Sequence, residues 1–245
     1  MTASFTFVGR SLRHSVRSVD ALLTAILLPV SILLMFVYVF GGAIQSDGRY
    51  VDYVVPGIIV LCVGFGAAST AVAVALDMTT GVIDRFRSLP IASGAVLTGH
   101  VTASVARNVV STTLVLGVAL LCGFRPEGDP ARWLAAAGLL LALMIAISWL
   151  AACFGLIAKS VEGANAITFV AAFAPYVSSA FVPPESMPGA LQWIASHQPV
   201  TPIVDTVRAL TTGTPVGDEL YIAFAWCAGL ALVGRLGASY LFRRR

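Results

Sequence analysis

Long stretches without a charged side chain dominate this chain. Residues 21–46, 53–76, 133–158 and 163–184 contain no Asp, Glu, Lys or Arg. Two further apolar stretches, at about 101–122 and 220–242, are each interrupted by one arginine, Arg107 or Arg235. Each stretch reaches the ~20 residues that a helix needs to cross about 30 Å of hydrocarbon. The pattern predicts six membrane-spanning helices, at about 21–42, 53–76, 101–122, 133–157, 163–182 and 220–242.

The continuity of these stretches also sets the fold class. A backbone that crosses lipid must satisfy its own hydrogen bonds, as a helix or a closed barrel, and barrel strands alternate between apolar and polar residues. No such alternation is present. Charged residues make up only 11% of the chain, against about 25% in soluble domains. We predict an all-α integral membrane protein that forms a single domain over residues 1–245.

The twenty residues before the first span have a different pattern. An apolar stripe runs along one side of a helix built from them, and three basic side chains, Arg10, Arg13 and Arg17, fall on the other side. A basic amphipathic helix just before a span suits the membrane interface. We therefore expect residues 1–20 to form an interfacial helix that lies on the inner surface.

Residues 183–217 form the largest predicted outer segment, and they are not a plain hydrophilic loop. Two short apolar runs, 190–195 and 203–210, read as helices that are too short to cross the membrane. Thr201 is expected to cap the second helix, with Pro202 at its first position, and Gly213 is expected to end it. The segment predicts a re-entrant or interfacial helical hairpin between spans five and six.

Two groups of residues inside the spans are candidates for a substrate path or a dimer face. Gly64, Gly66 and Ser69 are small residues that let helix backbones approach closely in lipid, within one chain or between two copies. The second group is Pro175, Tyr176 and Ser178, where proline frees a backbone carbonyl and bends the fifth span.

The placement of Lys and Arg predicts the orientation. Six spans put both termini on one side, and that side holds nine basic residues: Arg10, Arg13, Arg17, Arg85, Arg87, Lys159, Arg243, Arg244 and Arg245. The other side holds four: Arg49, Arg125, Arg132 and Arg208. Because cytoplasmic loops carry the excess of basic residues, both termini are expected to be cytoplasmic. Fourteen arginines to one lysine, with abundant Ala, Gly and Val, indicate a GC-rich bacterial genome, and we expect the protein in the bacterial cytoplasmic (inner) membrane.

No catalytic or cofactor motif is present. The chain has no H-E-x-x-H, no G-x-S-x-G and no Gly-rich phosphate loop ending in Gly-Lys-Ser/Thr. No acidic residue lies in the middle of a span, which disfavours a proton-driven carrier. A net charge of only +3 gives nucleic-acid binding no support. We therefore expect no enzyme activity, bound cofactor or metal in this chain, and an energy source on another subunit.

A charged island stands out between the second and third spans. It reads Asp84-Arg85-Phe86-Arg87-Ser88-Leu89-Pro90, within an inner loop that runs to His100. The two arginines could simply add to the excess of positive charge on the inner side. Lysines would do that equally well, and they would not need the neighbouring Phe86, Leu89 and Pro90. Charged pairs together with apolar anchors are typical of a docking surface. We expect this island to bind a partner protein.

Two segments resemble those of a known family. The island continues through Ile91-Ala92 to Leu97-Thr98-Gly99-His100, and this run looks like the coupling segment of ABC-2 type transporter permeases. The segment Phe181-Val182-Pro183-Pro184-Glu185-Ser186-Met187-Pro188, with Leu191-Gln192-Trp193 and His197-Gln198-Pro199-Val200-Thr201-Pro202, is similar to the branch that includes daunorubicin-resistance membrane subunits. The resemblance covers essentially the whole chain, with His100 where many relatives have arginine.

The resemblance implies a half-transporter that pairs as a homodimer or heterodimer and binds two cytoplasmic ATPase subunits, which carry ATP and Mg²⁺. Residues 84–100 would be the coupling loop: Asp84, Arg85 and Arg87 would make polar contacts with the ATPase, Phe86 and Leu89 would fill its cleft, and Pro90 would end the short helix. The expected function is export of hydrophobic or amphipathic, drug-like compounds. Two alternatives remain: export of a lipid or lipid-linked glycan, and a membrane anchor that regulates an ATPase without transport.

Overall fold

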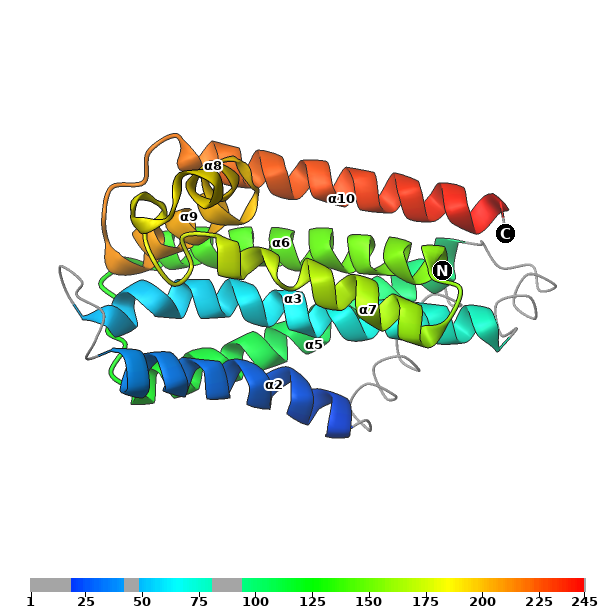
Figure 1. Cartoon of the computed structure of the whole chain (residues 1–245), viewed down its shortest axis with the longest axis horizontal. Coiled ribbons are helices and arrows are strands. Elements are labelled where there is room, and N and C mark those ends of the chain that lie inside the picture. Colours follow the sequence, from blue (N-terminus) through cyan, green and yellow to red (C-terminus); the bar gives the residue numbers. More distant parts are fainter. Residues whose placement is uncertain (1–18, 42–48, 81–93, 245) are drawn as a thin grey trace.

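The computed structural model describes residues 19–41, 49–80 and 94–244, and in these ranges the chain is helical, with no strand (Figure 1). This confirms the predicted all-α class. In chain order the elements are α2 (Val19–Leu34) with its π-helical continuation η1 (Met35–Phe40), α3 (Tyr50–Thr79), α5 (Gly94–Leu121), α6 (Pro130–Ile157), α7 (Val161–Ala171), the 3-10 turns η2 (Ala174–Val177) and η3 (Pro184–Ser186), α8 (Gly189–His197), α9 (Val200–Thr212) and α10 (Glu219–Arg244).

Four of the described helices are long and apolar enough to cross a membrane: Tyr50–Thr79, Val96–Leu121, Pro130–Ile157 and Glu219–Phe242. They coincide with predicted spans two, three, four and six. The first and fifth predicted spans coincide with shorter apolar helices, Ile26–Phe40 and Val161–Val177. The structure therefore supports a multi-pass membrane protein with four clear spans, and the count of six stays a prediction.

The fifth predicted span, 163–182, is broken and not merely bent. α7 ends at Ala171, and the short 3-10 turn η2 follows, with Pro175 near its start. Proline has no backbone N–H to donate, and it disfavours helical geometry at the residue before it. Ser178, directly after this turn, has an extended backbone, and further turns follow it. This break carries the chain from α7 to the hairpin helices α8 and α9.

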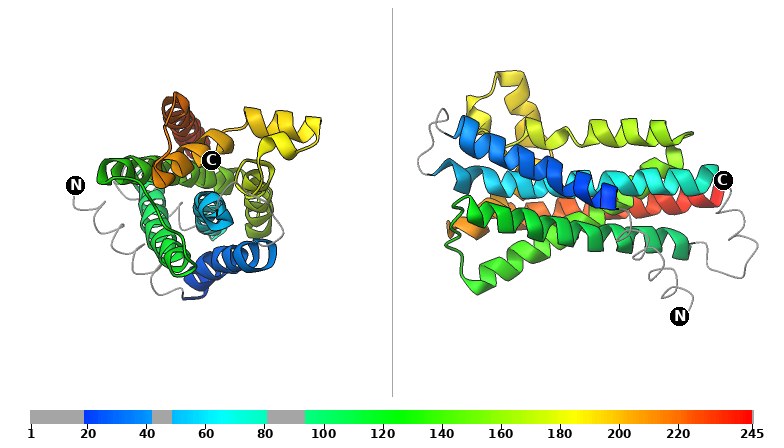
Figure 2. Two further views of the ribbon diagram at one scale, coloured as in Figure 1. Left: turned by 90° about the vertical axis from the view of Figure 1, so that its left-hand side faces the viewer. Right: turned by 90° about the horizontal axis from the view of Figure 1, so that it is seen from below.

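α3 is the central helix of the bundle. It contacts α2, α5, α6, α7 and α9, and end-on it lies inside the ring that the other helices form (Figure 2, left). In its most apolar stretch 67% of the residues are buried, against 17% in α10, which packs on α6 and α9 at the periphery. Small residues along α3, among them Gly57, Ala67 and Ala71, let its neighbours approach closely.

The helix ends follow local sequence signals, with one exception. Asp129 caps α6, since its side chain accepts a hydrogen bond from the Arg132 amide at 2.8 Å. Gly213 ends α9 as predicted, with a left-handed φ of 78° that glycine adopts without strain. The predicted Thr201 cap is wrong. α9 begins at Val200, two residues before the predicted start at Pro202, and the Thr201 hydroxyl donates to the Ala195 carbonyl oxygen at 2.5 Å.

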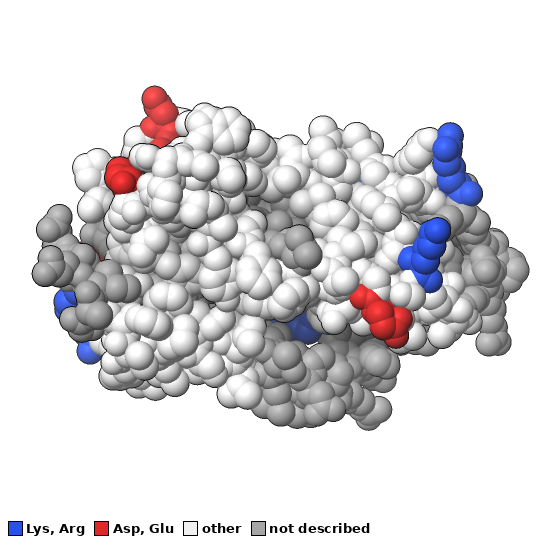
Figure 3. Space-filling view, in the orientation of Figure 1, with Lys and Arg blue, Asp and Glu red and all other residues white. Residues whose placement is uncertain are grey.

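Charge separates the two ends of the bundle from its middle. On the face shown in Figure 3, most charged side chains lie near the ends, and the surface between them is largely uncharged. The end that carries α8 and α9, here called the hairpin end, holds all four arginines predicted to share one side. There Arg49 bonds Gly123, the Arg125 amide bonds Asp52, Arg132 bonds Thr214 and Arg208 bonds Tyr53. α10 ends at the opposite end of the bundle (Figure 1).

Candidate functional site

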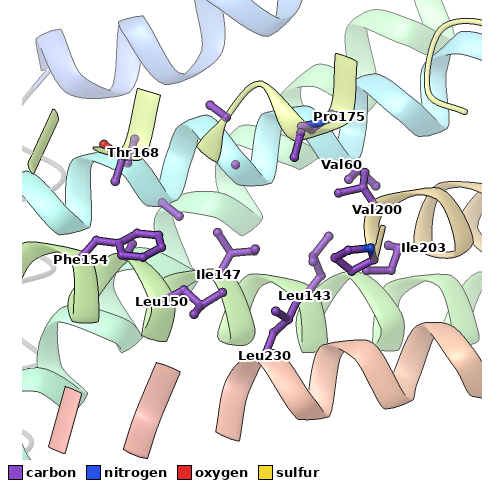
Figure 4. Close-up of a pocket in the computed structure, with 17 residues that line it drawn as sticks. Val60, Leu143, Ile147, Leu150, Phe154, Thr168, Pro175, Val200, Ile203 and Leu230 are labelled. Carbon is purple, nitrogen blue, oxygen red and sulfur yellow. The ribbon is translucent and has the colours of Figure 1, made fainter. Parts of the chain in front are cut away.

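An apolar pocket of about 210 Å³ lies inside the helical bundle, between α3, α6 and the segments that follow the break in α7. It extends from Phe154 and Thr168 at one end to Val60, Val200 and Ile203 at the other (Figure 4). α10 contributes Leu230 to its wall. We refer to it as the apolar pocket.

The lining is almost free of polar groups. Among the seventeen lining residues, Thr168 alone has a polar side chain. Its hydroxyl donates to the backbone oxygens of Ala164 and Asn165 at 2.9 and 3.0 Å, so it is satisfied within its own helix. No charged residue contributes to the wall. Such a pocket favours an apolar guest, because a polar or charged guest would lose its hydration without finding partners.

Small residues and the break in α7 together leave this space open. A Cβ added at Gly64 would meet no atom within 4 Å, so this part of α3 has no neighbour against it. Ala67 and Ala68 continue the same wall, and Ala172, Ala174 and Pro175 face it from the broken segment. The break at residues 172–177 places Ala172, Ala174 and Pro175 at the pocket wall. The local sequence therefore shapes the pocket from both sides.

Of the six residues predicted for a substrate path or dimer face, only Gly64 and Pro175 line this pocket. Gly66 instead faces α5, where its missing side chain makes room for the buried Asn108. The half-buried Ser69 donates to the Gly66 carbonyl oxygen at 2.9 Å. Intramolecular packing thus accounts for these two positions.

The two remaining residues of the second group have structural partners near the break. Tyr176 stacks on Phe181, with ring centroids 5.2 Å apart. Ser178 is fully buried, and its hydroxyl donates to the Pro175 carbonyl oxygen at 2.6 Å while accepting from the Ala180 amide at 3.1 Å. Both residues hold the broken segment in shape beside the apolar pocket.

A cluster of four polar side chains lies at the hairpin end, and the sequence analysis did not single it out. Its members are Tyr53 on α3, Ser179 after η2, and Asp205 and Arg208 on α9; we call it the Arg208 cluster. The Arg208 guanidinium donates to the backbone oxygens of Tyr53 and Ser179, at 3.1 and 2.6 Å, and pairs with Asp205. It also lies over the Tyr53 ring, 3.9 Å from its centroid.

A second, open pocket of about 550 Å³ borders this cluster and differs from the apolar pocket in its chemistry. It is lined by three arginines and three carboxylates: Arg49, Arg125, Arg208, Asp52, Glu127 and Asp205. Arg49 pairs with Asp52 at 2.9 Å, which ties the start of α3 together. We call this the charged pocket. Its three positive and three negative side chains balance, so the pocket is polar without a net charge.

At the opposite end of the bundle, α3 and α5 are joined beside the predicted coupling loop. The His100 Nε2 lies 2.9 Å from a carboxylate oxygen of Asp77. Asp77 lies near the end of α3, and His100 lies in the second turn of α5. The pair therefore links the two helices from which residues 81–93 extend. His100 therefore has a local partner in Asp77. Many relatives have arginine at this position, so the resemblance alone did not assign a role to the histidine.

We expect His100→Ala to loosen this junction slightly. Partly exposed ion pairs contribute roughly 0–1 kcal/mol, so the thermal unfolding midpoint of the purified protein should fall by only a few degrees. His100→Arg should restore it, because arginine can also pair with Asp77. If the alanine and arginine variants unfold at the same lowered temperature, the pair does not stabilise the junction.

Two predicted sites lie outside the described residues. These are the interfacial helix with Arg10, Arg13 and Arg17, and the charged island Asp84–Pro90. The part of the predicted 84–100 loop that the structure describes, from Gly94 onward, is the first turns of α5. Over the described ranges, no group of three or more His, Cys, Asp or Glu side chains could hold a metal ion.

Comparisons with known proteins give one consistent result. The profile of the ABC-2 type transporter family matches residues 2–211. The chain is 32% identical to the daunorubicin resistance ABC transporter permease protein DrrB1 of Streptomyces coeruleorubidus, over 99% of this chain and 89% of that protein. It is 25% identical to the probable doxorubicin resistance ABC transporter permease protein DrrC of Mycobacterium tuberculosis, over 96% and 86% of the two chains.

Proposed function

Because this chain belongs to the ABC-2 type transporter family, we propose that it is the permease subunit of an ATP-driven exporter of hydrophobic or amphipathic compounds. It is a multi-pass membrane protein. The family assignment covers most of the chain, so the proposal concerns the whole molecule and not an appended domain.

The apolar pocket is the observation that supports this cargo class. Its wall lacks charged side chains, and its one hydroxyl is already satisfied. A strongly charged solute would find nothing there to replace its hydration shell. An apolar or planar aromatic compound would lose only unfavourable contact with water. The relatives named for daunorubicin and doxorubicin resistance support compounds of this kind.

The energy would come from a partner. ABC transporter permeases work with ATPase subunits, in general as dimers. We propose that this chain has no catalytic role itself and binds two cytoplasmic ATPase subunits, which hold ATP and Mg²⁺. In this proposal residues Asp84 to Pro90 dock on the ATPase, next to the interfacial helix with Arg10, Arg13 and Arg17.

The bundle would lie in a bacterial cytoplasmic membrane with both termini inside. Nine Lys and Arg flank the spans on the side of the charged island, against four on the hairpin side. The four gather at the hairpin end of the structure. By the positive-inside rule, the hairpin end faces outward. The apolar pocket would then release cargo toward α8 and α9.

ATP hydrolysis tests the proposal against its rivals. Reconstitute the permease with its ATPase in liposomes, and measure hydrolysis with daunorubicin and, separately, with added lipid-linked glycan. An exporter of amphipathic compounds should show several-fold stimulation by daunorubicin. Stimulation by the lipid-linked glycan alone would indicate the lipid exporter instead. Hydrolysis that responds to neither would leave only the membrane anchor.

A further inference from the structure

We propose that the Arg208 cluster is the outer gate of the apolar pocket, holding α9 closed over it and separating it from the charged pocket. This inference rests on the proposed function and its orientation. It assigns a task to Tyr53, Ser179, Asp205 and Arg208, which lie outside the residues that the sequence pointed to.

The contacts of the cluster join three segments that are distant in sequence. Arg208 reaches the Tyr53 and Ser179 carbonyl oxygens while pairing with Asp205. The Ser179 hydroxyl donates to Asp205 at 2.7 Å, and the Tyr53 hydroxyl donates to the Ser179 carbonyl oxygen at 3.0 Å. One guanidinium thus connects α9, α3 and the segment after η2. Removing it would break all of its cross-links at once.

The same three segments form the outer end of the apolar pocket. Val60 lies seven residues after Tyr53 on α3, which places it on the same helix face and about 10 Å deeper. Ile203 on α9 lines the pocket five residues before Arg208, and Pro175 precedes Ser179 by four. The cluster therefore covers the pocket where the pocket approaches the hairpin end.

On the other side, Tyr53, Asp205 and Arg208 also line the charged pocket. None of the four cluster residues lines the apolar pocket itself, but α3 and α9 border both pockets, and the cluster joins these two helices at the charged pocket. Its side chains are only partly exposed, 16% for Arg208 and 29% for Asp205. Their hydrogen bonds can be exchanged for water from the charged pocket, so opening would leave no buried charge without a partner. Opening of the cluster would therefore avoid the desolvation cost of leaving a buried ion without a partner.

α9 has hydrogen bonds at both ends, and near its start the Thr201 hydroxyl donates to the Ala195 carbonyl oxygen. At its C-terminal end, the Glu127 amide donates to the Thr211 carbonyl oxygen at 3.0 Å, and Arg132 donates to Thr214 at 2.9 Å. These bonds can serve as a hinge. The buried face of α9 also carries Thr206, whose hydroxyl is fully buried with no hydrogen-bond partner among the described residues. An unsatisfied buried hydroxyl destabilises the closed arrangement, and opening would let it form a hydrogen bond to water.

Thiol labelling from outside the cell tests the gate in the full permease–ATPase complex. In a variant with Cys62, Cys122, Cys153 and Cys227 replaced by alanine, Val60→Cys places a reporter thiol on the pocket wall. A membrane-impermeant maleimide should label it slowly. Arg208→Ala should raise the labelling rate at least tenfold, and Arg208→Lys should give an intermediate rate, because lysine keeps the charge without the planar fork of donors.

Two controls separate a gate from general loosening. Arg125→Ala removes another arginine of the charged pocket, whose side chain donates to the Leu120 and Phe124 carbonyl oxygens among the described residues, and it should leave labelling unchanged. Val63→Cys places a thiol at a fully buried position that does not line the pocket, and it should stay unlabelled when Arg208 is alanine. Unchanged labelling of Val60→Cys in the Arg208→Ala variant, or equal labelling of both reporters, would overturn the gate. Labelling needs no transport, so its outcome is independent of the ATP hydrolysis test.

Discussion

Replacing Gly64 with leucine is expected to reduce transport at least tenfold while leaving the complex assembled. An added Cβ at this position meets no atom within 4 Å, so the helix accepts the change without displacing a neighbour. The rest of the side chain would extend into a cavity of only about 210 Å³ and occupy space that cargo needs. Transport in cells or vesicles measures the loss, and daunorubicin binding to the purified complex should weaken in parallel.

Two matched variants isolate the effect of filling the pocket. Gly64→Ala adds a methyl group and should retain most of the transport. Gly117→Leu makes the same exchange on α5, at an exposed position where an added Cβ also meets nothing within 4 Å and which does not line the pocket. It should transport like the unmodified protein. Equal transport by Gly64→Leu and Gly117→Leu would show that cargo does not pass through the pocket.

Alanine at both Arg85 and Phe86 is expected to weaken ATPase binding by at least about 2 kcal/mol, or roughly 30-fold, the effect of losing interface hot spots. Arginine supplies charge-assisted hydrogen bonds, and phenylalanine supplies the buried apolar area. Co-purification of the ATPase with the tagged permease measures the loss. Transport should fall with it, because motion can no longer pass between the subunits.

Lys159→Ala is the matched control for this double variant. Lys159 is an exposed cation in the connection between α6 and α7, at the end of the bundle where α3 ends and α5 begins, and it should not affect ATPase binding. Undiminished ATPase binding and transport in the Arg85 and Phe86 variant would reject the docking site. Loss of binding in the Lys159 variant as well would point to a nonspecific effect of charge.

Four of the spans were predictable because the length of an uncharged stretch can be counted directly in the sequence. α3, α5, α6 and α10 coincide with uncharged or nearly uncharged runs, since the bilayer imposes a minimum length on each. The helices α8 and α9 were also predictable, because prolines and Gly213 delimit them, and their re-entrant or interfacial placement stays a prediction. The start of α9 was missed by two residues. Thr201 found a tertiary partner in the Ala195 carbonyl oxygen, and no local rule encodes that contact.

The site was predictable only in part. Gly64 was singled out as a small residue for close helix packing, but it borders a gap; Pro175 was singled out because proline interrupts a helix, and it lies at the break. Gly66, close by on the same helix, faces Asn108 instead, and only the packing of α3 against α5 decides which glycine borders a cavity. The Arg208 cluster was missed for a related reason. Its members lie at positions 53, 179, 205 and 208, and only the fold brings them together.

The central claim is that an ATPase drives amphipathic compounds through the apolar pocket of this chain. Inside-out membrane vesicles that contain the permease and its ATPase test it most directly, with daunorubicin uptake followed after addition of ATP. We predict ATP-dependent uptake that the Gly64→Leu variant abolishes and the Gly117→Leu variant retains. ATP-independent uptake, or equal ATP-dependent uptake by the two leucine variants, would contradict the claim.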